Sequence, residues 1–490
     1  MSVAGKSLRP VYTSGDGPAA ATKHMLLVSY FFPPVNVVGS MRWLRIAQYA
    51  AERGWSFDVV MVHPTGDSSV DPASTMAVDL EKLAELPRGV NIYQVSDRTS
   101  WLYEAQRSIW QMLRPIIRWR TDPSTDGRPT RPSGPQQKSE RAGAAEGEGE
   151  GEGEGEGEGR SPRRAAYLTR LHYGEFRRWA RDAARAAAHI VRERRPDIIA
   201  SSGPPHSAHE AARQIADRTG IPWVMDMRDP WGAPENTPAD FAGPAWARVT
   251  GMLEGRCVEA AKLVVLNTEA ARRELASRYP DRADRFITVM NGADPLRTEL
   301  PVTRSTRFTI AYAGNIYVGR DPTVFFAALA RVIRDLSLTP EQIGADFLGG
   351  GDYARDIVLS AAREAGIAPF VSHTPRQSHR EALAFLSRAP MLLNLPQHHH
   401  LAIPAKVFEY VQMPSWLMVL AESGSATELL LRDSTADVLD PRDVDGIAER
   451  LRCRFLQHAR GERPSPVNAS GRFDRDRQSQ ILLDALAPFA

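Results

Sequence analysis

The stretch IPAKVFEY (residues 403–410), followed by MPSWLMVL (residues 413–420), combines a short polar helix with an apolar strand. Lys406 and Glu409 stand three residues apart, so they share one face of the predicted helix. The apolar run that follows is typical of a buried parallel strand. Such a pair is most often a surface ion pair of small energetic value. Here it lies beside a predicted core strand in a chain whose cations are mostly arginine, which favours a polar binding site.

A strand, loop and helix pattern surrounds this stretch and predicts a second domain over residues 298–470. The strand at 308–313 runs into a loop that contains Gly314, Asn315 and Gly319-Arg320, and a helix follows. Backbone amides at such a helix start can bind a phosphate, and an arginine is a two-pronged donor to it.

Lys406 adds a positive point charge to the same phosphate site. Glu409 is placed to accept hydrogen bonds from the two vicinal hydroxyl groups of a ribose. A further helix start at Ser425-Ala426 adds backbone amides. We therefore predict a nucleotide donor site formed by Gly39, Gly314, Asn315, Arg320, Lys406, Phe408, Glu409, Ser425 and Ala426.

Residues 24–297 predict a first domain of the same kind. A strand at 24–30, a loop that contains Gly39, a helix at 41–54 and a strand at 57–62 form a βαβ unit. In such units ligands bind at the carboxyl ends of the strands. The loop has a single glycine and no GxGxxG motif, so Gly39 serves either close helix packing or the approach of a ligand.

Two further strands of this domain end in polar loops, SSGPPH (201–206) and DMRDPW (226–231). Carboxylates beside Arg228 form either a structural ion pair or an acceptor-side site, and His206 and His209 are either general bases or structural hydrogen-bond partners. The acceptor-side candidates are Arg42, His206, Asp226 and Arg228. The catalytic candidates are Arg320, Lys406 and Asp229.

Three segments differ in composition from the two domains. Residues 1–23 predict a flexible tail, and residues 121–164, with a Glu-Gly alternation at 146–159, predict a disordered insertion without a catalytic role. Residues 101–120 mix aromatic residues with arginines, which is typical either of a helix at a membrane interface or of a helix packed on its own domain.

Composition narrows the class of protein. The chain has 490 residues and a net charge of +2, which gives no general attraction to nucleic acid. It shows no signal-peptide pattern and no run of about 18 apolar residues, so we expect a cytoplasmic protein with at most peripheral contact at the inner face of the membrane. Cys257 and Cys453 fit a reducing compartment.

We predict no metal site. The histidines at 398–400 have no partners at metal-ligand spacing. Asp443-Val-Asp445 has the spacing that some transferases use for a divalent cation, but it opens a predicted helix, where an aspartate acts as an N-cap. We expect no bound cofactor.

Taken together, these motifs resemble glycosyltransferase family 4 of the GT-B fold, in the branch with bacterial surface-polysaccharide transferases. The resemblance covers nearly the whole chain apart from residues 1–23 and 121–164. It rests on FPP (32–34) with Gly39 and Arg42, SSGPPH (201–206), DMRDPW (226–231), NGAD (291–294), YAGN (312–315) with Gly319-Arg320, and IPAKVFEY (403–410).

The resemblance implies an α/β GT-B protein, in which two Rossmann-like domains face each other across a cleft and a C-terminal helix at 471–490 crosses back to the first. It implies a retaining transfer from a nucleotide sugar to a saccharide or lipid-linked acceptor, without an obligatory metal. Arg320 and Lys406 would stabilise the leaving diphosphate, Glu409 would bind the ribose, and Gly39 would let its loop approach the donor phosphate.

The chain departs from the family pattern at two positions. Leu401 stands where the Glu-x7-Glu motif has its first glutamate, and Asn315 stands where many members have an arginine. Two alternatives to an active transferase follow. One is a catalytically inactive GT-B protein that binds a nucleotide or a partner. The other is a sugar-nucleotide epimerase, which would need an acid/base pair that the sequence does not present.

Overall fold

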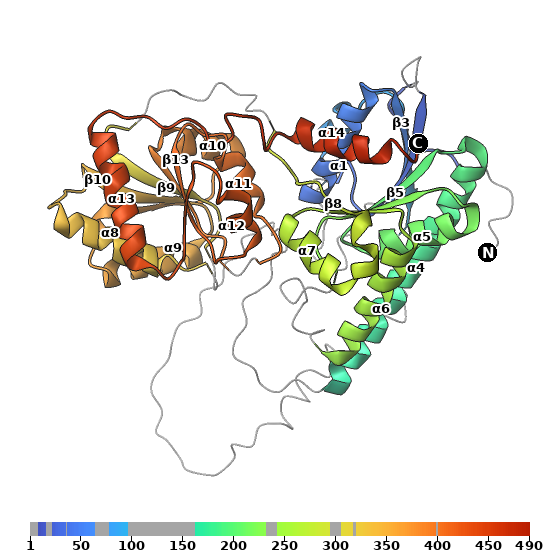
Figure 1. Ribbon diagram of the computed structural model, residues 1–490, viewed down its shortest axis with the longest axis horizontal. Helices are drawn as coiled ribbons and strands as arrows, with labels where there is room; N and C mark the ends of the chain where they lie inside the picture. The colour runs from blue at the N-terminus through green and yellow to red at the C-terminus, as the bar shows by residue number, and fades with distance from the viewer. Residues whose placement is uncertain are drawn as a thin grey trace, which may run out of the picture.

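The computed structural model describes residues 8–15, 22–35, 37–63, 78–96, 162–231, 243–294, 305–316, 320–397 and 400–490. Two α/β domains lie side by side, each built around one mostly parallel sheet (Figure 1). The segment 101–120, the insertion as far as residue 161, Gly319 and the histidines at 398 and 399 lie outside the described residues.

The first domain contains an eight-stranded sheet in the order β1-β4-β3-β2-β5-β6-β7-β8. Its central strands have helices on both faces, so they are apolar along almost their whole length. The strands are β1 (Tyr12–Thr13), β2 (Lys23–Ser29), β3 (Trp55–Val62), β4 (Val90–Val95), β5 (Ile198–Gly203), β6 (Trp223–Met227), β7 (Leu263–Leu266) and β8 (Phe286–Thr288).

Strand β1 corrects the prediction of a flexible tail over residues 1–23. Tyr12 and Thr13 pair antiparallel with Ile92 and Asn91 of β4. Tyrosine and threonine favour strands, and the open edge of β4 offers unpaired backbone groups. Part of the predicted tail is therefore the edge strand of the first sheet.

Helices α4, α5 and α6 cover one face of this sheet, and α1 covers the other. Helix α1 begins earlier than the predicted residue 41, so Gly39 lies in its first turn. Helix α4 begins at a proline inside the predicted insertion, because proline suits the first position of a helix. The helices are α1 (Val38–Ala51), α2 (Glu81–Ala84), α4 (Pro162–Arg194), α5 (Ser207–Thr219), α6 (Pro244–Ala260) and α7 (Glu269–Arg278).

The second domain has a six-stranded sheet in the order β11-β10-β9-β12-β13-β14. All of its pairings are parallel. The strand order reverses between β9 and β12, and ligands of open α/β sheets bind beside such a reversal. The strands are β9 (Phe308–Ala313), β10 (Ile343–Leu348), β11 (Val371–Thr374), β12 (Met391–Asn394), β13 (Trp416–Leu420) and β14 (Asp437–Leu439).

The predicted helix and strand of the stretch 403–420 are confirmed, because α11 covers residues 405–410 and β13 follows it. Apolar side chains of α11 and β13 belong to one core cluster. The helices of this domain are α8 (Thr323–Asp335), α9 (Asp352–Glu364), α10 (His379–Arg388), α11 (Ala405–Tyr410), α12 (Ala426–Leu431) and α13 (Val444–Ala459).

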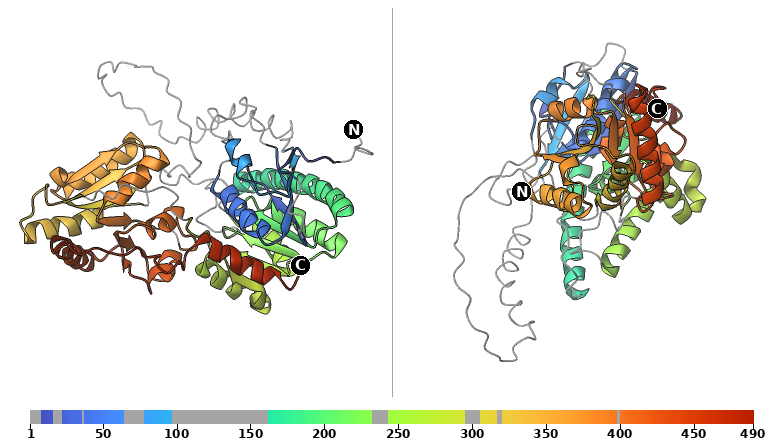
Figure 2. Two further views of the ribbon diagram at one scale, coloured as in Figure 1. Left: turned by 90° about the horizontal axis from the view of Figure 1, so that it is seen from above. Right: turned by 90° about the vertical axis from the view of Figure 1, so that its left-hand side faces the viewer.

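The C-terminal helix α14 (Arg475–Leu486) returns to the first domain, as the resemblance implied (Figures 1 and 2). Leu482, Leu483 and Leu486 pack into the cluster that contains Trp43 of α1. The chain enters this helix beside the segment that leaves the first domain, where Ala293 bridges to Asp474. Within the described ranges, no helix is both long enough and apolar enough to cross a bilayer.

Candidate functional site

The loops after β9 and β10 meet backbone to backbone. The amide of Gly314 donates a 2.8 Å hydrogen bond to the carbonyl of Leu348. Gly314 has φ +140° and Gly349 has φ +118°, and a Cβ on Gly349 would lie 2.8 Å from the carbonyl oxygen of Gly314. Both positions therefore require glycine, for conformation and for space.

Gly314 and Gly349, together with Gly350 and Gly351, form a surface that we call the glycine floor, and it continues toward α9. A Cβ on Gly350 would lie 2.7 Å from Oδ1 of Asn315, and Gly351 directly precedes the first turn of α9. Sequence reasoning did not assign the run 349–351 to the site. Its signal was three successive glycines immediately after a predicted strand.

Lys406 reaches over this floor from α11. Its Nζ donates a 3.1 Å hydrogen bond to the hydroxyl of Tyr312 and lies 4.6 Å from the centroid of the tyrosine ring. A Cβ on Gly314 would collide with the same Nζ. Among the described residues no carboxylate pairs with Lys406, so a half-buried ammonium group faces the glycine loop. That arrangement suits an anionic ligand.

Tyr410, one turn after Lys406 on the same side of α11, fastens this helix to the end of β9. Its hydroxyl accepts a 2.8 Å hydrogen bond from the amide of Ala313 and donates one of 3.1 Å to the carbonyl of the same residue. Burial raises the pKa of Tyr410, and the positive charge of Arg320 acts in the opposite direction. Arg320 lies between β9 and α8 and is 7% exposed.

Glu409, the predicted ribose acceptor, is partly exposed and contacts a residue that sequence reasoning missed. Its Oε1 lies 3.0 Å from Nε2 of His379, the first residue of α10. The hydrogen bond with Glu409 raises the pKa of His379. Phe408, by contrast, is buried in the apolar core of the domain, which indicates a packing role.

The amides of Ser425 and Ala426 are already used within the protein. Ser425 donates to the carbonyl of Glu422 at 3.1 Å, and Ala426 donates to the carbonyl of His400 at 2.8 Å. The hydroxyl of Ser425 caps α12 through the amide of Glu428. The loop therefore does not present these two amides to a phosphate, contrary to the sequence prediction.

In the first domain, Gly39 makes room for an arginine. A Cβ at this position would collide with the guanidinium of Arg228, which also donates to the carbonyl of Pro204. Burial lowers the pKa of Arg228, whereas the neighbouring Asp229 acts in the opposite direction. This geometry favours close packing over ligand approach as the reason for glycine at position 39.

Asp226 forms a buried structural pair with Arg42. The carboxylate accepts hydrogen bonds of 2.8 and 3.1 Å from Arg42, 2.8 Å from Trp43 and 3.1 Å from Ser202. Arg42 also donates to the carbonyls of Val289 and Met290, next to the interdomain crossing. With their hydrogen bonds made inside the protein, neither residue is presented to an acceptor.

Asp229 and the two histidines lie nearby at the ends of β5 and β6. Burial raises the pKa of Asp229. Burial lowers the pKa of His206 and brings that of His209 to about 3, so both rings are neutral. His209 is fully buried against the hydroxyl of Ser201, and His206 stacks on Trp231 with ring centroids 4.6 Å apart. The hydrogen bond with Ser201 and the complete burial of the ring indicate a structural role for His209, not that of a general base.

The predicted N-cap role of Asp443 is confirmed. Its Oδ1 accepts a 2.9 Å hydrogen bond from the amide of Gly446, and Asp445 pairs with Arg331 on α8. No group of three or more potential metal ligands occurs within the described ranges.

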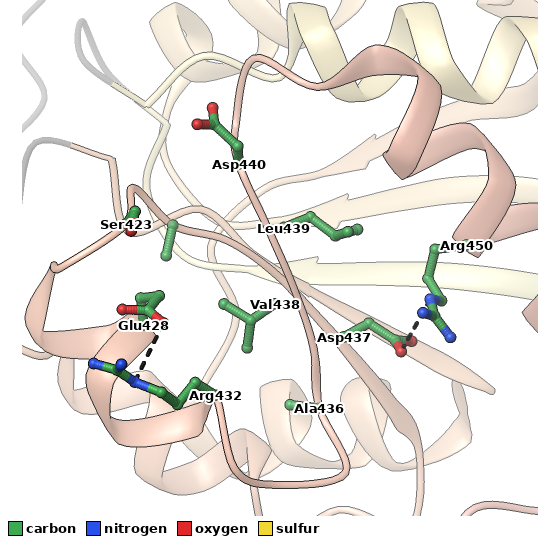
Figure 3. Close-up of a pocket in the computed structure, with 10 residues that line it drawn as sticks. Ser423, Glu428, Arg432, Ala436, Asp437, Val438, Leu439, Asp440 and Arg450 are labelled. Atoms are coloured by element: carbon green, nitrogen blue, oxygen red, sulfur yellow. Dashed lines mark ion pairs between the residues drawn. The ribbon is translucent and has the colours of Figure 1, made fainter.

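A cavity of about 330 Å³ lies between β14, α12 and α13 (Figure 3). Two ion pairs line it, Glu428 with Arg432 and Asp437 with Arg450. None of the predicted site residues contributes to its wall. We therefore place the candidate site at the glycine loops of β9 and β10, not in this cavity.

Residues 142–292 match the family model described as a glycosyl transferase 4-like domain. This segment contains α4 to α7 and the loops that end β5 and β6. No curated protein matches the chain.

Solved structures share the arrangement of both domains. A glycosyltransferase from Rickettsia africae ESF-5 is 11% identical with a TM-score of 0.53, over 96% of this chain and 99% of that one. A lipopolysaccharide outer core galactosyltransferase is 11% identical with a TM-score of 0.54, over 95% and 99% of the two chains. The E. coli trehalose-6-phosphate structure bound with UDP-2-fluoro glucose is 12% identical with a TM-score of 0.55, over 96% and 100%.

The family-model match agrees with the resemblance over residues 142–292, and the solved structures show the fold. The chain carries a glycosyltransferase domain and has the GT-B fold.

Proposed function

We propose that this chain transfers a sugar from a nucleotide-sugar donor to a saccharide or lipid-linked acceptor, with retention of configuration at the anomeric carbon. The observation that carries the proposal is the ammonium group of Lys406, which lies over Gly314 at the ends of β9 and β12 and has no carboxylate partner among the described residues. A diphosphate supplies the negative charge that this arrangement lacks.

The chemistry follows from where charge develops. The bond between the anomeric carbon and the diphosphate oxygen breaks, and its electron pair stays on that oxygen. Lys406 and Arg320 stabilise this charge, which is the largest change in the reaction. An acceptor hydroxyl forms the new bond to the anomeric carbon and loses its proton.

Asp229 is our candidate to take that proton. Burial raises the pKa of this carboxyl group, which makes it a stronger base than an ordinary aspartate. It lies at the carboxyl end of the first sheet, in the domain assigned to the acceptor. We propose that Arg320 and Lys406 carry the charge stabilisation without a metal, and activity that persists in excess EDTA is the expected result.

Two further parts of the proposal concern partners. An acceptor with a lipid carrier agrees with the likeness in fold to the lipopolysaccharide galactosyltransferase. Membrane contact through residues 101–120 stays a prediction, because this segment lies outside the described residues. Turnover separates the transferase from an inactive protein. Net release of the nucleoside diphosphate separates it from an epimerase, whose product still carries the sugar on the nucleotide.

The experiment incubates the purified protein with labelled UDP-, GDP- and dTDP-sugars and measures donor hydrolysis and nucleotide binding. One donor is expected to be hydrolysed slowly without acceptor. Lys406→Ala is expected to lower this rate at least tenfold, since it removes a charge at the leaving group. Lys262→Ala, an exposed lysine of the first domain, is the control and should match the wild type. Folded wild-type protein that neither hydrolyses nor binds any donor would overturn the proposal.

A further inference from the structure

We infer that Tyr312 is a positioning residue, which holds the ammonium group of Lys406 over the glycine loop and thereby sets the affinity for the diphosphate part of the donor. This inference rests on the proposed function. Its basis is the hydrogen-bond geometry around one buried hydroxyl group.

The hydrogen-bond direction at this hydroxyl is determined by its two partners. Tyr312 donates its only proton to the carbonyl oxygen of Asn315 at 3.0 Å. The ammonium of Lys406 has donors and no acceptor, so it must donate to the hydroxyl oxygen at 3.1 Å. The hydroxyl therefore links the lysine to the backbone of the β9–α8 loop.

The tyrosine itself has little freedom to move. Its side chain is 1% exposed, and its ring lies 5.4 Å from that of Phe347 on the neighbouring strand β10. A lysine side chain, in contrast, is a flexible stem with many rotamers, and ordering it opposes binding. A rigid, buried hydroxyl that accepts from Nζ places the charge before the ligand arrives, which is the general advantage of preorganisation.

The contact between Tyr312 and Lys406 could not be predicted from their positions in the sequence. Tyr312 and Lys406 are 94 positions apart, and they meet because β9 and β12 are neighbours in the sheet. Tyr312 is therefore a second residue of the proposed diphosphate site, and it acts on the ligand only through its contact with Lys406.

The test measures binding by calorimetry for UDP, GDP and dTDP and for the matching nucleosides, using the diphosphate that the wild type binds best. Tyr312→Phe keeps the ring and removes only the hydroxyl. It is expected to weaken diphosphate binding about tenfold, the typical effect of one hydrogen bond to a charged group. Nucleoside binding should stay within twofold, because a nucleoside makes no contact with Lys406.

A double-mutant cycle separates positioning from a general structural effect. In a Lys406→Met background, Tyr312→Phe should change diphosphate binding by less than twofold. Tyr279→Phe, which removes a hydroxyl bonded to Glu254 in the first domain, is the matched control and should bind like the wild type. Equal effects of Tyr312→Phe with and without Lys406, or equal losses for nucleoside and diphosphate, would overturn the inference alone.

Wild-type protein that binds none of the diphosphates would overturn the proposed function and this inference with it. If Tyr312→Phe does not fold, Lys406→Arg gives the second test. It keeps the positive charge but replaces the compact ammonium with a planar fork that does not fit the Tyr312 hydroxyl in the same way. A tenfold selective loss of diphosphate affinity is expected, and unchanged affinity would contradict the inference.

Discussion

The hydroxyl of Thr268 in the first domain donates a 2.7 Å hydrogen bond to the carbonyl oxygen of Leu401 in the second. Thr268 also caps α7 through the amide of Ala271, so its position is well determined. The side chain of Leu401 packs against apolar clusters of both domains. The position at which the family pattern has a glutamate is therefore an apolar contact between the domains.

We expect that Leu401→Glu does not restore a missing catalytic group. It should lower the free energy of unfolding by about 1–3 kcal/mol, because a charged carboxylate replaces an apolar side chain at a packed contact. Urea unfolding and donor hydrolysis are the measurements. Leu401→Met keeps the contact apolar and should cost less than about 1.5 kcal/mol. A glutamate variant with higher turnover and unchanged stability would refute this view of the position.

Asp226→Ala should be strongly destabilising, by about 3–5 kcal/mol, because it leaves the buried guanidinium of Arg42 without its counter-charge. Asp335→Ala on α8 is the matched control, since the exposed pair of Asp335 with Arg331 contributes only about 0.2–0.5 kcal/mol. Guanidinium unfolding curves compare the two. A loss as small as that of Asp335→Ala would show that the buried pair is dispensable.

Two glycine substitutions test the floor of the candidate site. Gly349→Ala puts a Cβ 2.8 Å from the backbone oxygen of Gly314 at φ +118°, so the loop must move. We expect at least a tenfold loss of nucleotide affinity together with about 1–3 kcal/mol of backbone strain. Gly351→Ala meets nothing within 4 Å and should be tolerated. Calorimetric titration of a nucleoside diphosphate distinguishes them, and equal behaviour of the two variants would contradict the prediction.

Affinity for a nucleoside should depend on pH through His379. The hydrogen bond with Glu409 raises the pKa of His379, so the cationic ring holds the carboxylate most strongly below the ordinary value of about 6.5, and this hold is lost as the pH rises through the raised pKa. We therefore expect affinity to increase a few-fold from pH 6 to pH 8 as Glu409 becomes available to the ribose. A nucleoside has no phosphate, which keeps ligand titration out of the measurement.

His379→Ala is the control for this pH effect and should bind the nucleoside with a nearly constant affinity over the same range. Both side chains are substantially exposed, 71% and 42%, so the effect on stability should be small. A wild-type affinity that does not change with pH, or a variant that keeps the full dependence, would exclude His379 as its source.

Much of the fold could be predicted from local sequence. The apolar run before Gly314 predicted β9 at its observed bounds, and the pattern around Lys406 predicted α11 and β13. Strand β1 was missed because two residues carry almost no periodic signal, and their pairing depends on an edge of β4 formed far along the chain.

The candidate site was predictable in part. Lys406, Arg320 and Gly314 follow strand ends, and parallel strands bring their carboxyl ends to one edge of a sheet. The roles of Asp226 and Arg42 were not predictable, because the same motif reads equally as an acceptor site or as a buried pair until its hydrogen bonds are seen.

The sequence by itself determined the two α/β domains, the strands that carry the loops and the cation on α11, because hydrophobic spacing and turn residues act between close neighbours in the chain. Only the tertiary structure decided that Tyr312 holds Lys406, that His379 holds Glu409 and that Leu401 joins the two domains. The physical reason is that such contacts depend on strand order and domain packing, which bring together residues that no local pattern relates.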